Sequence, residues 1–244
     1  MKQFPSLFAI SLFSTLMLSS PASAQERAFE PSRREVVLET TSGNIRIALF
    51  NETPIHRDNF IKLVRNGYYD GTLFHRVIRD FMIQGGADDS RDAQEGDVCG
   101  ETDTGYTLPA EFRLPKLFHK RGMVAAAREP DESNPAKASS GAQFYIVWGR
   151  KQSKRELQRQ RERLDTLDGG RTPMTDEMAR FYSEIGGAPH LDGAYTIFGE
   201  VVEGMDVVDR IQRQATDEHD RPVTDERLMR AYVVEVTTQQ APLP

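Results

Sequence analysis

The sequence predicts a mainly β protein in which short antiparallel strands form a closed barrel. Several short runs within its 244 residues alternate apolar and polar side chains, as strands do. Glycine-rich segments connect these runs, and only two segments of the main body have the spacing of a packed helix. This pattern favours a barrel closed by short turns, although composition alone leaves a two-sheet sandwich open.

The predicted elements begin with a hairpin, in which two strands flank a turn at residues 41–43. Thr53 and Pro54 then fit the cap and the first position of a helix that Gly67 ends, with an apolar stripe at Ile55, Asn59, Phe60, Leu63 and Val64. A second packing helix is expected at residues 205–211. Strands are predicted at residues 36–40, 44–50, 73–78, 81–84, 122–127, 143–148, 196–202 and 228–237.

Residues 73–87, which read LFHRVIRDFMIQGGA, contain the most unusual pattern of the chain. Arg76 and Gln84 stand there among Phe, Val, Ile and Met, and Gly85 and Gly86 end the second run. An arginine on a strand is usually solvated or ion-paired, because it is rarely buried without a partner. The alternative is a fixed guanidinium that faces an apolar pocket and accepts a ligand there.

Three blocks of the sequence resemble the cyclophilin family of peptidyl-prolyl isomerases. The first is similar to F-H-R-x-I-x-x-F-M-x-Q-G-G-D, with Ala87 in place of the final Asp. Residues 140–146 (SGAQFYI) resemble G-S-Q-F-F-I, and residues 191–201 resemble L-D-G-x-x-x-x-F-G-x-V. The resemblance implies a closed eight-stranded antiparallel barrel with a helix over each open end and a peptide groove on its outer wall.

The resemblance also implies the site, residue by residue. Arg76, Gln84 and Phe81 take the catalytic positions, and Gln84 would hydrogen-bond the substrate backbone. The resemblance places the proline socket at Phe81, Met82, Tyr145 and Leu191, and ordinary core packing is the alternative for each of them. The implied substrate-binding residues are Met82, Ala127, Arg128, Gln143, Tyr145, His190, Leu191 and Tyr195.

Some site positions depart from the family pattern. His190 stands where many members have Trp, a main contact of cyclosporin-class inhibitors, so weak cyclosporin binding is expected. Tyr195 stands where many members have His. Arg128 stands where others have Asn, a replacement that is frequent in bacterial relatives, and the Arg128 side chain is expected to reach more of the substrate. Tyr145 replaces Phe and adds a hydroxyl that needs a partner.

The reaction that the resemblance implies needs no nucleophile, metal or proton transfer. Rotation about a peptide bond meets a barrier of about 18–20 kcal/mol, because the C–N bond has partial double-bond character. As the bond twists, the proline nitrogen becomes pyramidal and regains its lone pair. A fixed cationic donor aimed at that nitrogen stabilises the twisted state more than the planar states. Arg76 is the candidate donor, and a lysine would lack the planar fork of the guanidinium.

Two other classes of function remain as alternatives to an isomerase. A binding module or holdase would capture proline-containing segments with little turnover. A glycosidase would need two suitably placed acids, and no pocket pattern in the sequence supports one. The preserved Arg76, Phe81, Met82 and Gln84 favour turnover of X-Pro bonds in folding exported proteins.

Residues 1–24 have the pattern of a secretory signal peptide. Lys2 precedes an apolar run at residues 7–18, and Ala22-Ser23-Ala24 provides a cleavage site after Ala24. The run is shorter than the roughly 20 residues of a spanning helix, which disfavours a membrane anchor. A periplasmic or secreted protein is expected, with a flexible lead-in at 25–35, an isomerase domain at 36–238 and a disordered tail at 239–244.

An insertion at residues 149–188 is expected to form a helical hairpin that docks beside the site by its second helix. Ser153 and Glu156 fit a capping box for a first helix that runs to about Leu167. Thr172-Pro173 would cap a second helix with Met174, Met178, Phe181 and Ile185 on one face. The basic residues of the first helix are either solvated or form a patch for acidic clients or anionic lipid headgroups.

Composition narrows the possible partners and cofactors. The net charge of −6 argues against a nucleic-acid-binding surface. Cys99 is the only cysteine, which excludes an internal disulfide, and the histidines lack metal-ligand spacing. The acidic segment 88–106 does not fit an EF-hand loop and is read as a solvated surface loop. We therefore expect no metal or cofactor, no membrane insertion and, by analogy with relatives, a monomer that binds proline-containing polypeptides.

Overall fold

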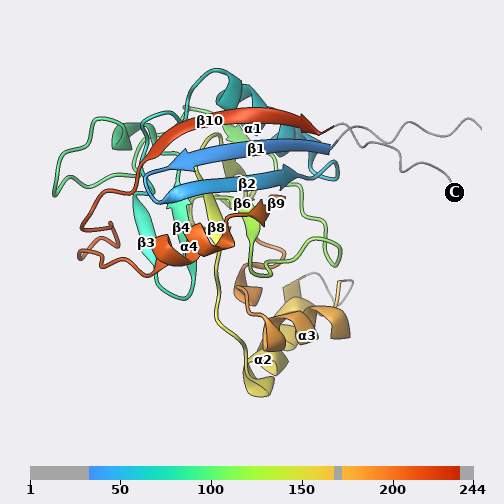
Figure 1. Ribbon diagram of the computed structural model, residues 1–244. Coiled ribbons are helices and arrows are strands. Elements are labelled where there is room, and N and C mark those ends of the chain that lie inside the picture. Colours follow the sequence, from blue (N-terminus) through green and yellow to red (C-terminus); the bar gives the residue numbers. More distant parts are fainter. Residues whose placement is uncertain (1–32, 168–171, 237–244) are drawn as a thin grey trace, which may run out of the picture. The chain divides into compact units, whose positions relative to one another are not determined.

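The computed structural model describes residues 33–167 and 172–236, and eight of its strands form one antiparallel sheet (Figure 1). These strands are β1 (Arg33–Thr40), β2 (Gly43–Leu49), β3 (Arg76–Ile78), β4 (Met82–Gly85), β6 (Met123–Ala126), β8 (Phe144–Val147), β9 (Ile197–Glu203) and β10 (Leu228–Val236). They are hydrogen-bonded in the order β10-β1-β2-β9-β6-β8-β4-β3. The predicted strands are thus all present, with shifts of a few residues at their ends.

The sheet curls but does not close. Its two edges are β10 and β3, and no ladder of paired strands joins them within the described residues. Isolated contacts connect the chain near these edges, such as the bridge between Leu73 and Arg227. β3 has only three residues, and among the described residues its ladder is with β4 alone. The prediction of a closed barrel is therefore not confirmed, and the sheet is a half-barrel.

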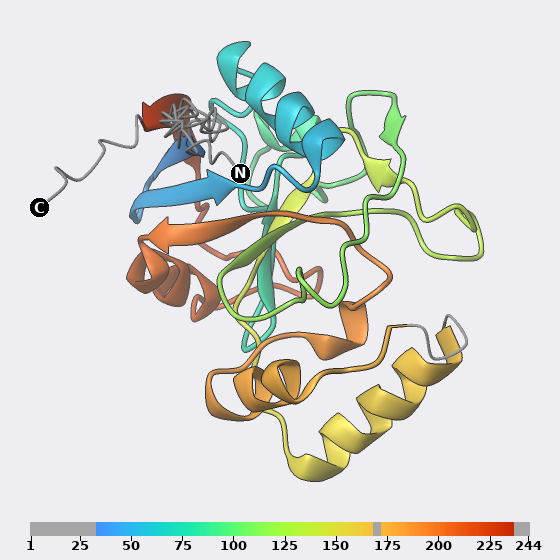
Figure 2. The same ribbon diagram turned by 90° about the vertical axis from the view of Figure 1, so that its right-hand side faces the viewer.

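Two helices bury their apolar sides against the inner face of the curled sheet. They are α1 (Pro54–Arg65) and α4 (Met205–Gln212), the two helices that the sequence predicts outside the insertion. Phe60 of α1 and Val208 of α4 belong to one core cluster with inward side chains of the strands, such as Ile47 and Ile146. Figure 2 shows α1 above the sheet, with α4 on another side of it. The sequence thus predicts the two helices that cover the core.

The start of α1 differs from the prediction. Thr53 occupies the N-cap position but its side chain makes no capping hydrogen bond. The carboxylate of Glu111 accepts hydrogen bonds from the backbone N–H groups of Ile55 and His56 instead, at 3.3 and 3.0 Å. Ile55 is 44% exposed, and His56 takes its place in the buried stripe. A distant carboxylate therefore satisfies donors that were assigned to a local cap.

The insertion contains helices α2 (Lys154–Leu167) and α3 (Asp176–Glu184), which lie below the sheet in Figure 1. The capping box of α2 is present, because Ser153 N donates to Glu156 at 2.8 Å and Glu156 N donates to the Ser153 hydroxyl at 3.3 Å. The predicted start of α3 is wrong. Thr175, not Thr172, is the N-cap, and its hydroxyl accepts a hydrogen bond from Met178 N.

The apolar face of α3 also differs from the prediction. Tyr182 is fully buried, whereas the predicted Ile185 is 43% exposed. Ile185 lies at the C-cap, where the backbone leaves the face that Met178 and Tyr182 share. The sequence pattern treats tyrosine as amphipathic and therefore misses this contact.

Smaller elements complete the fold. β5 (Thr107–Leu108) and β7 (Ser139–Ser140) form a separate two-stranded sheet, and η1 (Asp88–Ser90) and η2 (Pro189–Leu191) are 3₁₀ turns. The segment 88–106 is mostly loop, as predicted. β1 begins at Arg33, inside the predicted flexible lead-in, because residues 33–35 pair with β10.

The predicted signal peptide, most of the lead-in and the tail at 239–244 lie outside the described residues. Across residues 33–167 and 172–236, none of the helices combines the length and the hydrophobicity of a membrane span.

Candidate functional site

Three neighbouring strands bring the central side chains of the site to one face of the sheet. Arg76 of β3 stands opposite Gln84 of β4, and Gln84 stands opposite Tyr145 of β8. Directly paired residues of antiparallel strands project to the same side. Met82 lies two residues before Gln84 and shares that face, because side chains alternate along a strand. The site is therefore on the outer face, opposite the α1 and α4 core.

Gly86 explains why the signature ends in glycine. Its φ is +91°, a left-handed conformation that residues with a side chain avoid. A Cβ atom there would lie 2.7 Å from the carbonyl oxygen of Ala142. The chain can leave β4 at this point only because no side chain is present, which fixes where the loop after the site strand begins.

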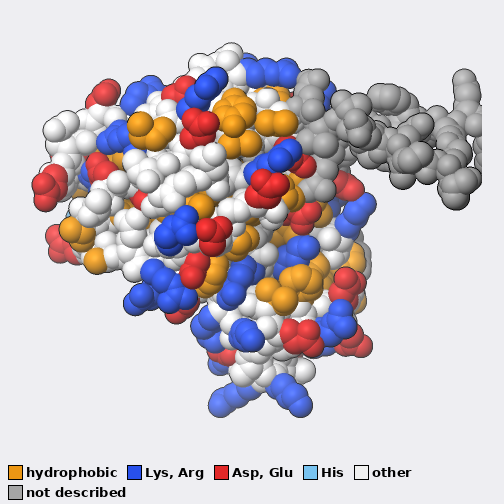
Figure 3. Space-filling view, viewed as in Figure 1, with side chains coloured by type: hydrophobic (Ala, Val, Ile, Leu, Met, Phe, Trp, Pro, Cys, Tyr) orange, Lys and Arg blue, Asp and Glu red, His pale blue; other side chains and the backbone are white. Residues whose placement is uncertain are grey.

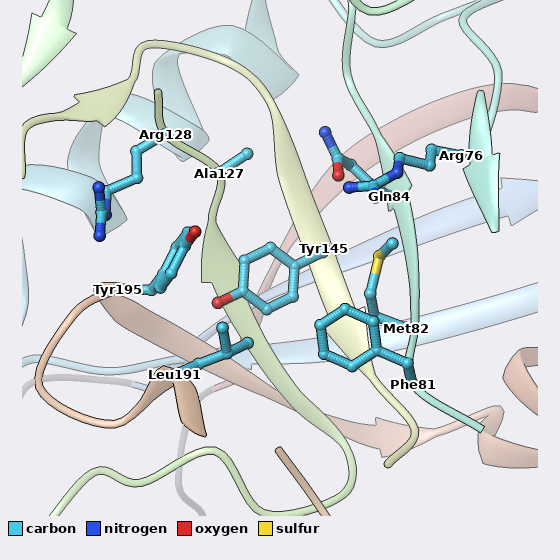
Figure 4. Close-up of a pocket in the computed structure, with 9 residues that line it drawn as sticks. All are labelled: Arg76, Phe81, Met82, Gln84, Ala127, Arg128, Tyr145, Leu191 and Tyr195. Carbon is cyan, nitrogen blue, oxygen red and sulfur yellow. The ribbon is translucent and has the colours of Figure 1, made fainter. Parts of the chain in front are cut away.

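A pocket of about 170 Å³ opens on this outer face (Figure 4). Nine of the eleven predicted site residues line it, namely Arg76, Phe81, Met82, Gln84, Ala127, Arg128, Tyr145, Leu191 and Tyr195. The other two predicted residues lie beside it. Gln143 lines the neighbouring hollow, and His190 packs behind Phe81 with 5.2 Å between the ring centroids. The family motifs thus lead to one continuous surface.

Arg76 lies at the rim of the pocket, next to Gln84 (Figure 4). Its Nε atom is 3.3 Å from Asp220 Oδ2, and the two side chains are 46% and 43% exposed. An ion pair as exposed as this one contributes little to stability, roughly 0–1 kcal/mol. The Nη atoms of Arg76 have no hydrogen-bond partner within the described residues. They remain available to a substrate.

A chain of amides holds Gln84 in place. Gln84 Nε2 donates to Gln143 Oε1 at 3.0 Å, and Gln143 Nε2 donates to the carbonyl oxygen of Gly100 at 2.9 Å. Gln143 therefore positions Gln84, and no hydrogen bond joins Gln143 to Arg76 among the described residues. The side-chain oxygen Oε1 of Gln84 has no hydrogen-bond partner among the described residues, so it can accept a hydrogen bond from a substrate N–H group.

The floor of the pocket is apolar. Met82, Tyr145 and Leu191 are 3%, 4% and 9% exposed, and they belong to a second hydrophobic cluster outside the sheet. Phe81 is half-buried against this cluster. A ring the size of proline can displace water from such a surface with a gain of about 25 cal/mol per Å² of apolar area. The alternative reading of these residues as core is partly true, because three of them are both core and pocket floor.

The Tyr145 hydroxyl finds its partner in a buried polar chain. It lies 3.0 Å from His119 Nε2, and His119 Nδ1 lies 2.9 Å from Asp192 Oδ1. The hydroxyl of Tyr182 donates to Asp192 Oδ2 at 2.6 Å. Burial raises the pKa of Tyr145 and of Tyr182 well above the ordinary value, so both hydroxyls keep their protons. This chain joins the pocket to helix α3, and the sequence does not predict it.

Arg128 does not reach outward as the sequence suggests. Its Nε atom donates to the carbonyl oxygen of Ala194 at 2.7 Å, and Nη1 donates to that of Glu129 at 2.8 Å. The guanidinium also covers the ring of Tyr195, 4.5 Å from its centroid, and pairs with Asp131. The side chain therefore stiffens this wall of the pocket.

A second hollow of about 610 Å³ adjoins the first. Gln84, Ala127 and Arg128 line both, so the two form a continuous groove across the outer face. An extended polypeptide can lie along such a groove with one side chain in the smaller pocket. Gln143 lies on the wall of the larger hollow.

The lining of the smaller pocket limits its chemistry. None of the nine residues is acidic, which removes the pair of carboxylates that a glycosidase requires. Within the described residues no cluster of three or more His, Cys, Asp or Glu side chains could hold a metal ion. The fold and the pocket define a protein with a small, largely apolar pocket on its outer face and a partly exposed guanidinium at the rim.

The chain belongs to the cyclophilin-type peptidyl-prolyl cis-trans isomerases and is an isomerase. Residues 35–233 match the family described as "Cyclophilin type peptidyl-prolyl cis-trans isomerase/CLD". A protein of Staphylococcus aureus (strain USA300), named as a candidate peptidyl-prolyl cis-trans isomerase, is 35% identical over 78% of this chain and 87% of its own length. A Staphylococcus haemolyticus protein of the same name is 33% identical over 78% and 86%. The family resemblance is thus confirmed.

Solved structures support the fold. A cyclophilin-type peptidyl-prolyl cis-trans isomerase of Cryptosporidium parvum covers 84% of this chain and 99% of its own, with a TM-score of 0.59 and 21% identity. A second crystal structure of that protein, in the presence of the dipeptide Ala-Pro, has a TM-score of 0.57 and 22% identity over 83% and 99%. At these identities the likeness concerns the arrangement of the chain.

Proposed function

We propose that this isomerase accelerates X-Pro bond rotation in folding exported proteins and that Arg76 stabilises the twisted imide. The observation that carries the proposal is the position of Arg76 at the rim of the apolar pocket, with its Nη atoms unpaired among the described residues. The proline ring would occupy the space between Phe81, Met82 and Leu191. The Ala-Pro dipeptide used with the Cryptosporidium relative agrees with a substrate of this class.

Catalysis requires that the site bind the twisted state of the imide more tightly than the planar states. A planar imide nitrogen has its lone pair in resonance and accepts hydrogen bonds poorly, whereas the twisted nitrogen accepts well. A donor that gains strength only in the twisted state lowers the barrier without trapping either isomer. Gln84 would hold the backbone of the substrate while the apolar floor holds the ring, so that only the X-Pro C–N bond rotates.

The test is a proline-peptide isomerisation assay on three variants. Arg76→Ala is expected to lower kcat/KM by roughly 10²-fold, the usual effect of removing one fixed donor. Arg76→Lys should recover only part of the rate, because the ammonium lacks the fork. Arg230→Ala is the matched control, since Arg230 lies on β10 over Tyr232 and away from the pocket.

Peptide binding measured in parallel separates turnover from capture. If wild type and Arg76→Ala bind the peptide equally and both isomerise it at the uncatalysed rate, the chain is a holdase and the catalytic role of Arg76 is wrong. A normal rate in Arg76→Ala would reject the mechanism alone and leave the isomerase in place.

We also propose that the chain is exported, cut after Ala24 and active as a monomer. The proposal rests on the pattern of Lys2, the apolar run at 7–18 and the Ala22-Ser23-Ala24 site. The monomer is supported by the scatter of large exposed apolar side chains over separate elements of the described residues, such as Ile55 on α1 and Met229 on β10.

A further inference from the structure

A third hollow lies on the far side of Phe81 from Ala127 and Arg128. It measures about 580 Å³ and is formed between the turn that precedes β4 and helix α2 of the insertion. The residues that matter here are Arg79, Asp80, Phe81, Arg159 and His190. We refer to this hollow as the insertion cleft. The family sequence blocks do not account for this cleft, because helix α2 of the insertion forms one of its walls.

The insertion cleft carries net positive charge in a chain whose net charge is −6. It contains Arg79, Arg150 and Arg159, with Asp80 and Glu156 as its acids. Arg150 and Glu156 neutralise each other, since Arg150 Nη1 lies 3.3 Å from Glu156 Oε2 and Nη2 bonds Oε1. This pairing removes one charge of each sign from the cleft.

Two guanidinium groups remain without a partner. Among the described residues, Arg79 and Arg159 form no hydrogen bond, ion pair or aromatic contact, and Arg159 is exposed. Asp80 is the only acid left to offset them in the cleft, so one net positive charge remains. Figure 3 shows Lys and Arg side chains at the lower left of the molecule, interspersed with Asp and Glu side chains.

The insertion cleft continues the groove of the isomerase site. Phe81 lines both the proline pocket and the cleft, and His190, which packs against Phe81, lines the cleft. In Figure 4, Phe81 and Met82 lie at the opposite side of the pocket from Ala127 and Arg128. A polypeptide that places a proline in the pocket therefore enters the cleft at one end only.

We propose that the insertion cleft binds an acidic segment of the same polypeptide whose proline occupies the pocket. The proposal rests on the proposed isomerase function and adds a preference for Asp or Glu on one side of the proline. The partner is a polypeptide and not a lipid, because the cleft adjoins the proline pocket, with Phe81 lining both. The charge complementarity comes from Arg79 and Arg159.

The test measures binding of fluorescent proline peptides at low salt. Each peptide carries two Glu residues that lie two to five residues from the proline, either before it or after it. Each is compared with the same peptide in which Gln replaces both Glu residues. One side alone should favour Glu, with a Kd about three- to tenfold lower, the scale of two partly exposed ion pairs. The preference should shrink as salt is added, because dissolved ions screen exposed charge pairs and the Debye length is already about 10 Å at 0.1 M.

Two double variants with equal loss of charge locate the effect. Arg79→Gln with Arg159→Gln should bring the Glu to Gln ratio of Kd to about one. Lys154→Gln with Arg155→Gln is the matched control, because both residues are exposed on α2 and outside the cleft, and it should keep the ratio. Circular dichroism and thermal unfolding verify that each variant folds.

Several results would overturn the proposal. These are an equal preference for Glu on both sides, no preference on either side, or the same loss in both double variants. Binding to vesicles of anionic lipid that is lost with Arg79 and Arg159, with no peptide preference, would assign the cleft to a membrane surface. Turnover of the Gln peptides is recorded separately, so a failure of the isomerase function is distinguished from a failure of the cleft.

Discussion

His75, which precedes Arg76, is a buried histidine whose charging opposes folding. It is 4% exposed, and its Nδ1 atom has no hydrogen-bond partner among the described residues. The ring lies against Gly100, where a Cβ atom would come within 2.9 Å of it. Burial lowers the pKa of His75 from 6.5 to about 4. The folded protein therefore holds this imidazole neutral.

The lowered pKa of His75 predicts a loss of stability in mild acid. Between about pH 6.5 and 4 the unfolded chain binds the proton and the folded chain does not, so the free energy of unfolding falls as the pH falls. From pH 7.5 to 5, wild type should lose about 2 kcal/mol more than His75→Gln. Urea unfolding at both pH values measures this difference.

His219→Gln is the control for the His75 prediction, because the side chain of His219 is 54% exposed. It should follow the wild-type pH dependence. Parallel pH curves for wild type and His75→Gln would contradict the assignment.

For single residues, the sequence predicts those that belong to a local motif and misses those whose partners are distant in the chain. Arg76, Gln84 and Tyr145 were predicted because they stand in the family blocks. Asp220, the partner of Arg76, is 144 residues away and has no motif of its own. The need for a partner for the Tyr145 hydroxyl could be predicted, but nothing in the sequence pointed to His119.

At the scale of elements, the strands with alternating or apolar patterns were predicted with small shifts. β5 and β7 were not, because two residues carry no periodicity. The cap of α1 was misassigned because Glu111 lies 55 residues from His56, whose backbone it binds. Local signals indicate where a helix begins, but they do not identify the group that satisfies its end.

The hydroxyl of Tyr182 connects helix α3 to the loop that carries His190 and Leu191, through its hydrogen bond to Asp192. Tyr182→Phe removes the hydrogen bond to Asp192 and leaves a buried carboxylate with one partner fewer. We expect a loss of about 1–3 kcal/mol of stability and a higher KM with kcat little changed. Urea unfolding and peptide isomerisation measure the two effects.

Tyr232→Phe serves as the control for Tyr182→Phe, since Tyr232 is a half-buried residue of β10 away from the pocket. It should change neither stability nor KM appreciably. A Tyr182→Phe protein with normal KM would separate α3 from the site.

At the scale of the whole molecule, the resemblance predicted the sheet, its outer groove and the two covering helices. The state of the barrel did not follow from the resemblance, because the family implies a closed barrel whereas no ladder joins β3 to β10 within the described residues. The sequence also predicted that the insertion docks beside the site, but it did not identify the contacts that anchor α2 next to Phe81. These contacts include Arg163 Nη2 to the carbonyl oxygens of Pro189 and Asp192, at 2.8 and 3.0 Å.

Export is the prediction that concerns the full chain. Expressed in a bacterium with a periplasm, the protein should be recovered there with Gln25 as its first residue. Ala24→Arg should block the cut and leave the longer precursor, whereas Ala28→Ser, four residues further on, should be processed normally. N-terminal sequencing of the fractions measures this, and an uncut cytosolic wild type would contradict it.

Asp192 connects two parts of the protein that would otherwise be separable. One oxygen of its carboxylate is hydrogen-bonded to His119 Nδ1, beneath the pocket, and the other accepts a hydrogen bond from Tyr182 of α3. In the full chain Asp192 is 0% exposed, so trimming the insertion would remove the Tyr182 hydroxyl and part of the protein that encloses this carboxylate beneath the proline pocket. A shortened enzyme would therefore have to supply a new hydroxyl or replace Asp192 with Asn at the same time.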